Sequence, residues 1–84
     1  MVKGVIKVRE MAERLCSKEV LAERIIAARK TKGWNRTKLV LHSGASEAAL
    51  YNIEHALYYP RLETLDVICA ALGLTLGEVL QCSE

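Results

Sequence analysis

Five cations lie close together between Arg29 and Lys38, and they are the residues best suited to bind a ligand. Arg36 and Lys38 follow Asn35, a good helix N-cap, so both are expected in the first turn of a helix. Cations at that end oppose the helix dipole by about 0.3–1 kcal/mol, and a bound phosphate would reverse the sign of this interaction. The cluster therefore favours a phosphate-bearing partner.

Catalytic and metal-binding patterns are missing from the sequence. The three cysteines, Cys16, Cys69 and Cys82, are widely spaced and form no CxxC pair, which argues against a zinc site or a disulfide framework. The sequence offers no credible nucleophile–base pair and no phosphate-binding glycine loop. We therefore expect no metal, no cofactor and no enzymatic activity. Cys69 is expected in the core, whereas Cys82 could cross-link a dimer on oxidation.

Charge is divided unevenly along the chain. Residues 1–38 hold eleven of the 12 Lys and Arg residues and four of the 10 acids, a formal charge of +7, and residues 39–84 carry −5. Such a dipolar chain suits nucleic acid or an acidic protein as a partner. The alternative, favoured for the scattered Lys3, Lys7, Arg9 and Arg14, is a set of solvated helix faces.

The composition predicts one small globular domain. Apolar residues make up 51% of the 84 positions and phenylalanine is absent, so the core must be aliphatic. The longest run of apolar residues and glycine, 67–74, is far shorter than the roughly 18 residues of a membrane span. The first ten residues are too charged for a secretory signal. We expect a cytoplasmic protein that makes no contact with membranes.

Caps and helical periodicity predict five short helices in residues 17–84. The expected N-caps are Ser17, Asn35, Ser46 and Thr75, and the fourth helix should cover about 62–72. Gly33 and Gly73 are expected to end helices, and 42–45 should form a turn. Residues 1–16 form an N-terminal extension, with a helix expected over about 7–16. The alternative there is a short strand over 5–8 that pairs across a dimer.

Six short motifs, in this order, resemble the lambda-repressor-like (Cro/XRE) helix-turn-helix family. They are Ile25-x-x-x-Arg29, Gly33-Trp34-x-x-x-x-Leu39, Gly44-Ala45-Ser46, Leu50-x-x-Ile53-Glu54, Pro60-x-Leu62-x-x-Leu65 and Ala71-Leu72-Gly73-Leu74. The resemblance implies an all-α fold, a compact five-helix domain over residues 17–84. It also implies a structural ion pair between Arg29 and Glu54.

In this family the third helix enters the major groove of DNA. The resemblance then implies base contacts by Ser46, Glu47, Ala48, Tyr51 and Asn52. It implies phosphate contacts by Lys32, Arg36, Thr37, Lys38, Ala49, His55, Tyr59 and Arg61. By its chemistry, Asn52 can pair with adenine and Glu47 can accept from cytosine.

The sequence departs from the family pattern near the third helix. That helix has no Lys or Arg, and Glu47 opposes the phosphate charge. Ala56 stands where the family usually has glycine in a left-handed cap. Alanine costs roughly 1 kcal/mol there, unless the chain takes another path. Tyr58 and Tyr59 can donate hydroxyls to DNA, or one of them can cover the core.

These observations predict a sequence-specific transcriptional regulator that binds double-stranded DNA as a homodimer, on half-sites about 34–36 Å apart. The expected dimer surface is the last helix, with Leu76, Val79 and Leu80, or else the N-terminal segment. The alternative function is a protein-interaction module, such as the antitoxin of a toxin–antitoxin pair with a small protein partner. The negative C-terminal half and the cation-free third helix motivate that alternative.

Overall fold

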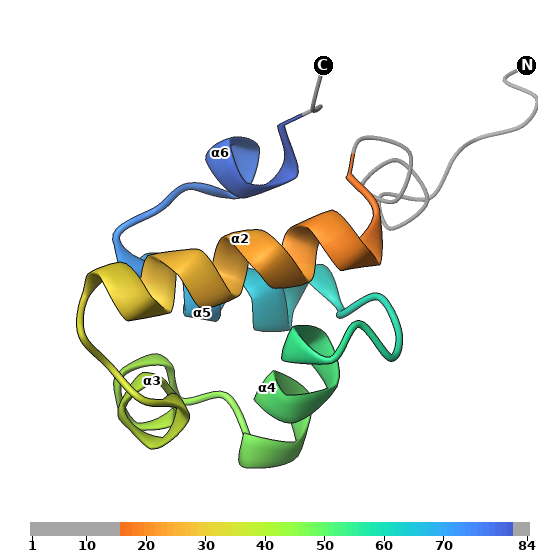
Figure 1. The fold of residues 1–84 in the computed structure, drawn as a ribbon. Coiled ribbons are helices and arrows are strands. Elements are labelled where there is room, and N and C mark those ends of the chain that lie inside the picture. The colour runs from red at the N-terminus through yellow and green to blue at the C-terminus, as the bar shows by residue number, and fades with distance from the viewer. Residues whose placement is uncertain (1–15, 82–84) are drawn as a thin grey trace, which may run out of the picture.

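The computed structural model describes residues 16–81 as a bundle of short helices (Figure 1). The helices are α2 (Lys18–Thr31), α3 (Arg36–Ser43), α4 (Glu47–Glu54), α5 (Leu62–Leu72) and α6 (Leu76–Leu80). Within this range no strand occurs, and the predicted all-α, five-helix fold is confirmed. The helix expected over 7–16, the alternative strand over 5–8 and the cross-link through Cys82 lie outside the described residues, apart from Cys16 itself.

Each predicted cap starts its helix by accepting a hydrogen bond from the first turn. The Ser17 hydroxyl accepts from the amide of Val20, three residues later. Each of the other caps accepts from the amide three residues after it. The remaining pairs are Asn35 with Lys38, Ser46 with Ala49, and Thr75 with Glu78. Glu78 returns a bond from its carboxylate to the Thr75 amide, which completes a capping box. These bonds satisfy amides that would otherwise lack a helical partner, so the helix starts follow from local sequence.

Three helices end in a Schellman motif, in which a left-handed residue reverses the chain. Gly33 and Gly73 fill that position after α2 and α5, and Ala56 fills it after α4 with a φ of 53°. The α4 motif carries both characteristic bonds, from the Leu57 amide to the Asn52 carbonyl (3.0 Å) and from the Ala56 amide to the Ile53 carbonyl (3.1 Å). The chain therefore keeps the glycine-type conformation with an alanine, at a cost of about 1 kcal/mol.

The core is aliphatic, as the composition predicts. Its largest fully buried side chains come from every helix: Leu21, Ile25, Leu39, Leu50, Ile53, Leu65, Ile68 and Val79. In Figure 1, α2 crosses the middle of the molecule, α3 and α4 lie on one side of it, and α6 lies on the other. The two sides of α2 therefore carry different parts of the domain.

The last helix belongs to the core of its own chain. Val79 and Leu80 are buried, and Arg24 of α2 donates from Nη1 to the carbonyls of Val79 (2.7 Å) and Gln81 (2.6 Å). Within the single chain, Val79 and Leu80 therefore pack into the core, and the half-buried Leu76 packs against it. No helix of residues 16–81 is long and apolar enough to span a membrane.

Candidate nucleic-acid interface

The helix-turn-helix unit consists of α3, a tight turn and α4. Gly44 ends α3 with a φ of 79° and donates from its amide to the Val40 carbonyl (2.9 Å), and the Ser43 hydroxyl accepts from the Ala45 amide (3.1 Å). Leu39 and Leu50 are fully buried where the two helices cross. This packing turns the opposite face of α4 to solvent.

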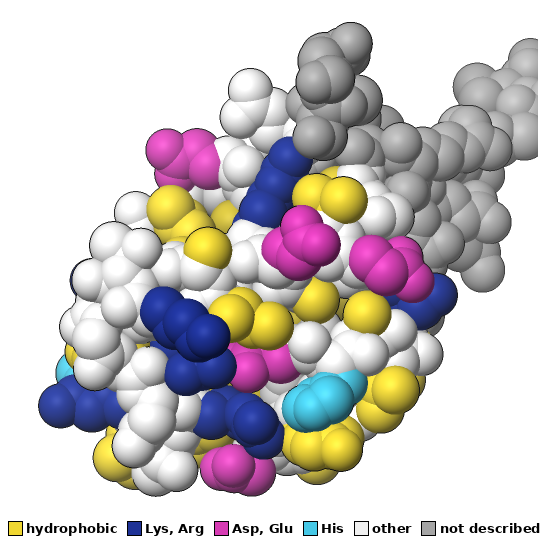
Figure 2. All heavy atoms as spheres, in the orientation of Figure 1, with side chains coloured by type: hydrophobic (Ala, Val, Ile, Leu, Met, Phe, Trp, Pro, Cys, Tyr) yellow, Lys and Arg dark blue, Asp and Glu magenta, His cyan; other side chains and the backbone are white. Residues whose placement is uncertain are grey.

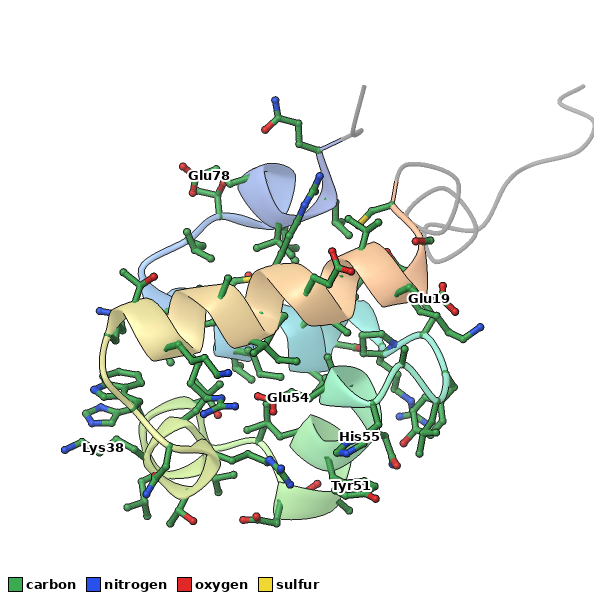
Figure 3. The ribbon with its side chains drawn as sticks, in the orientation of Figure 1. Glu19, Lys38, Tyr51, Glu54, His55 and Glu78 are labelled. Atoms are coloured by element: carbon green, nitrogen blue, oxygen red, sulfur yellow. The ribbon has the colours of Figure 1, made fainter. Side chains whose placement is uncertain are left out.

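The solvent-facing side of α4 carries most of the expected base contacts. Ser46, Glu47, Ala48 and Tyr51 are exposed, and Asn52 is half-buried. The Tyr51 and His55 rings stack at 3.9 Å between centroids, with 21° between their planes. Spacing of four residues on a helix brings these two rings together. Figure 3 shows both labelled side chains on the same part of α4.

A nearly buried carboxylate joins α2 to α4. Glu54 is only 4% exposed and accepts two bonds from Arg29, at 2.8 Å from Nε and 3.1 Å from Nη2. Arg29 is 13% exposed and also donates from Nη1 to the Trp34 carbonyl at 3.0 Å. A bidentate contact of this kind fixes the relative position of the two helices.

Arg36 also contacts the ion pair between Arg29 and Glu54, and the sequence did not indicate this contact. Its Nε lies 3.5 Å from Oε1 of Glu54, and its side chain is 32% exposed. That Nε is buried and has no hydrogen-bond partner within the described residues, so the contact with Glu54 is purely electrostatic. The Arg36 Cζ lies 5.4 Å from the Tyr51 ring centroid, a cation–π contact. Arg36 thus connects the buried ion pair to the exposed face of α4.

The other cations lie on the side of α3 and at the end of α2. Lys32, Thr37 and Lys38 are exposed, and Figure 2 shows Lys and Arg side chains gathered over these two elements. The Lys32 Nζ lies 5.1 Å from the Trp34 ring centroid. Trp34 in turn stacks on His42 at 4.4 Å. Lys32 is thus grouped with Trp34 and His42 at the end of α2 and on α3, and α4 itself carries no Lys or Arg.

The remaining expected phosphate contacts surround a cleft of about 420 Å³ between α4 and the start of α5. Ala49 and Arg61 line this cleft, and Arg61 is exposed at the N-terminal end of α5. Tyr59 also lines it but is buried in the core cluster. Of the two adjacent tyrosines, Tyr59 is thus the one that covers the core, and Tyr58 is exposed.

Tyr58 makes a contact that the sequence did not indicate. The Nδ2 of Asn52 donates to the Tyr58 hydroxyl at 2.6 Å. The two residues are six positions apart, and the left-handed turn at Ala56 brings the chain back toward α4. Helical periodicity does not predict this pair, because the path of the loop after α4 decides it.

The chemistry of the cysteine in α5 fits the core. Cys69 is fully buried, as expected. Burial, and after it the negative charges of Asp66 and Glu78, together raise the pKa of its thiol from 9.0 to about 11. Among residues 16–81, no group of three or more His, Cys, Asp or Glu side chains could hold a metal ion.

Comparison with known proteins assigns the chain to a family. Residues 8–84 match the family model of the Cro/C1-type HTH DNA-binding domain. The crystal structure of a hypothetical transcription factor, NHTF from Neisseria, is similar with a TM-score of 0.73, covering 98% of this chain and 88% of that chain. Its sequence identity of 20% limits that likeness to the fold. No curated protein sequence matches significantly. The motif resemblance is confirmed, and the chain belongs to the Cro/C1-type family of helix-turn-helix DNA-binding domains.

Proposed function

We propose that this chain is a sequence-specific transcriptional regulator that inserts α4 into the major groove of double-stranded DNA. One observation carries the proposal: the Cζ of Arg36, in the first turn of α3, lies 5.4 Å from the ring centroid of Tyr51 on the exposed face of α4. The turn holds both in one rigid unit, so a groove-bound α4 would bring the start of α3 to the phosphate backbone. The helix α4 has no cation of its own, and its neighbours supply the positive charge.

The proposed division of roles follows from exposure and chemistry. Base contacts are proposed for the exposed face of α4, and phosphate contacts for the residues around it. The base-contacting set is Ser46, Glu47, Ala48, Tyr51 and Asn52. The phosphate-contacting set is Lys32, Arg36, Thr37, Lys38, Ala49, His55 and Arg61. Tyr59 leaves that set because it is buried in the core.

Binding as a homodimer is part of the proposal. A helix of eight residues can reach only a few base pairs, and two copies on paired half-sites double the contacts. The proposed dimer surface is the last helix, where Leu76 is half-buried beside the buried Val79 and Leu80, or else the N-terminal segment.

Fluorescence anisotropy on duplexes selected from a random library tests the proposal, with scrambled duplexes for comparison. Asn52→Ala is expected to cost about 1–3 kcal/mol on the selected site and little on scrambled DNA. Lys38→Ala is expected to weaken all duplexes alike and to lower the salt slope by about one. Lys38 is a better phosphate probe than Arg36, because Arg36 also touches Glu54 and Tyr51. Selection of no sequence by the unmodified protein would refute the function.

A protein-interaction module is the second candidate function. One side of α5 supports it, because Glu63, Asp66, Val67 and Ala70 are all exposed at helical spacing. A small basic protein that co-purifies with the chain from its host, and that Asp66→Lys releases, would favour this candidate. A preparation without such a partner, with tight sequence-selective DNA binding, would favour the first.

A further inference from the structure

Asn52, the residue proposed to contact adenine, is held by a side chain from outside the recognition helix. Its Nδ2 donates to the hydroxyl of Tyr58 at 2.6 Å, the shortest side-chain contact on the exposed face of α4. Tyr58 is itself exposed, so the bond lies at the surface that is proposed to face DNA. We propose that Tyr58 is a positioning residue that fixes the amide of Asn52 for base recognition; the inference rests on the proposed function.

The backbone after α4 is built to produce this contact. The Leu57 amide donates to the carbonyl of Asn52 itself, and Ala56 adopts a left-handed conformation with a φ of 53°. Together they fold the chain back so that Tyr58 returns alongside α4. The strained Ala56 and the bond between Asn52 and Tyr58 thus belong to one local structure. This structure holds the Asn52 side chain in place.

The bond leaves Asn52 able to contact a base. A side-chain amide has two N–H donors and one carbonyl acceptor, and Tyr58 uses only one donor. The second N–H and the carbonyl oxygen remain, which is the pair needed for N7 and N6 of adenine. In the structure the Nδ2 end of the amide faces the Tyr58 hydroxyl, so the bond restricts the rotation of the Asn52 side chain before DNA binds.

Fixing the Asn52 amide before binding changes the discrimination between base pairs more than it changes the general affinity for DNA. A side chain that is already fixed loses less conformational freedom on binding, an effect of about 2- to 10-fold in affinity for one side chain. Scrambled DNA does not use the Asn52 amide and gains nothing from the bond. Removal of the Tyr58 hydroxyl should therefore reduce the preference at one base pair and leave binding to scrambled DNA unchanged.

The test compares Tyr58→Phe with Asn52→Ala, the double variant and Leu57→Ala, a control in the same exposed loop. Anisotropy is measured on a duplex selected by the unmodified protein and on its single-base-pair variants. We expect Tyr58→Phe to lower discrimination about 2- to 10-fold at the one A·T pair where Asn52→Ala abolishes it. The double variant should be no worse than Asn52→Ala alone, because both changes remove the same contact. Leu57→Ala should change none of these values.

Several results would overturn the inference. Equal loss on selected and scrambled DNA, with a flatter salt slope, would make the Tyr58 hydroxyl a phosphate ligand. Unchanged discrimination in Tyr58→Phe would refute the positioning role and leave the proposed function intact. If the unmodified protein selects no sequence, the proposed function fails and the positioning role fails with it.

Nuclear magnetic resonance of the DNA-free protein tests the contact separately. The side-chain amide signals of Asn52 are expected to shift in Tyr58→Phe and to stay in place in Leu57→Ala. The main-chain signals of α4 should be the same in both variants, because the Schellman bonds do not involve the hydroxyl. If the Asn52 side-chain signals do not shift in Tyr58→Phe, the inference is refuted without any DNA measurement.

Discussion

Replacement of Glu54 by alanine should be among the most damaging single changes in the domain. The carboxylate is 4% exposed and accepts two bonds from Arg29, at 2.8 and 3.1 Å, while Nε of Arg36 lies 3.5 Å away. Glu54→Ala leaves two guanidinium groups facing each other with no negative charge between them. Loss of one partner from a buried pair costs about 3–5 kcal/mol.

The cost of Glu54→Ala should lie at the lower end of that range. Arg29 is 13% exposed and Arg36 32%, so water can solvate part of each freed cation. Arg29 also keeps its bond to the Trp34 carbonyl. We expect a loss of about 3 kcal/mol, which lowers Tm by roughly 12–24 °C in a domain of this size.

Urea denaturation measures this loss, with Trp34 fluorescence and circular dichroism as independent signals. Glu19→Ala is the control, because Glu19 is 66% exposed and pairs with Lys18 at 3.7 Å, and it should cost less than about 1 kcal/mol. The double variant Arg29→Met/Glu54→Leu should recover part of the stability, because apolar side chains can replace a buried pair, whereas Arg36 and the Trp34 carbonyl still lose a partner. A loss below about 1 kcal/mol for Glu54→Ala would mean that the pair behaves as a surface pair. The reasoning from burial would then be refuted.

Three further predictions concern the loop after α4 and the core of α5. Ala56→Gly should raise the free energy of unfolding by about 0.5–1 kcal/mol in urea, because glycine removes the left-handed strain but loses some entropy on folding; a destabilised variant would contradict this. The pKa of the Cys69 thiol is raised to about 11, so the thiol stays protonated at pH 8, and peptide mapping should find it unmodified by iodoacetamide in the folded protein. The unfolded thiol ionises near pH 9.0, so the stability that Cys69 contributes is complete below that pH and is lost as pH rises toward 11. Cys69→Ser should reduce the loss of stability over that pH range.

The sequence determined the helices and the family of this protein. The four side-chain caps, and the glycines that end α2 and α5, act on their own neighbours within a few residues. Information of that kind is fully present in the chain, because a cap or a left-handed residue needs no distant partner. The composition likewise predicted an aliphatic core, since a chain without phenylalanine has little else to bury.

Only the tertiary structure decided which contacts the side chains of the candidate interface make with one another. The sequence offered Arg36 as a phosphate ligand, and the crossing of α3 with α4 turned it toward Glu54 and Tyr51. It offered Asn52 as a base contact, and the loop after α4 placed Tyr58 on its amide. These contacts depend on crossing angles and loop paths that the whole core sets.

The last helix illustrates the same limit. Its apolar residues could face a second copy or their own core, and periodicity is the same in both cases. The structure buries Val79 and Leu80 and ties the backbone carbonyls of Val79 and Gln81 to Arg24. A hydrophobic pattern specifies that a face must be covered, whereas the packing of the other helices specifies what covers it.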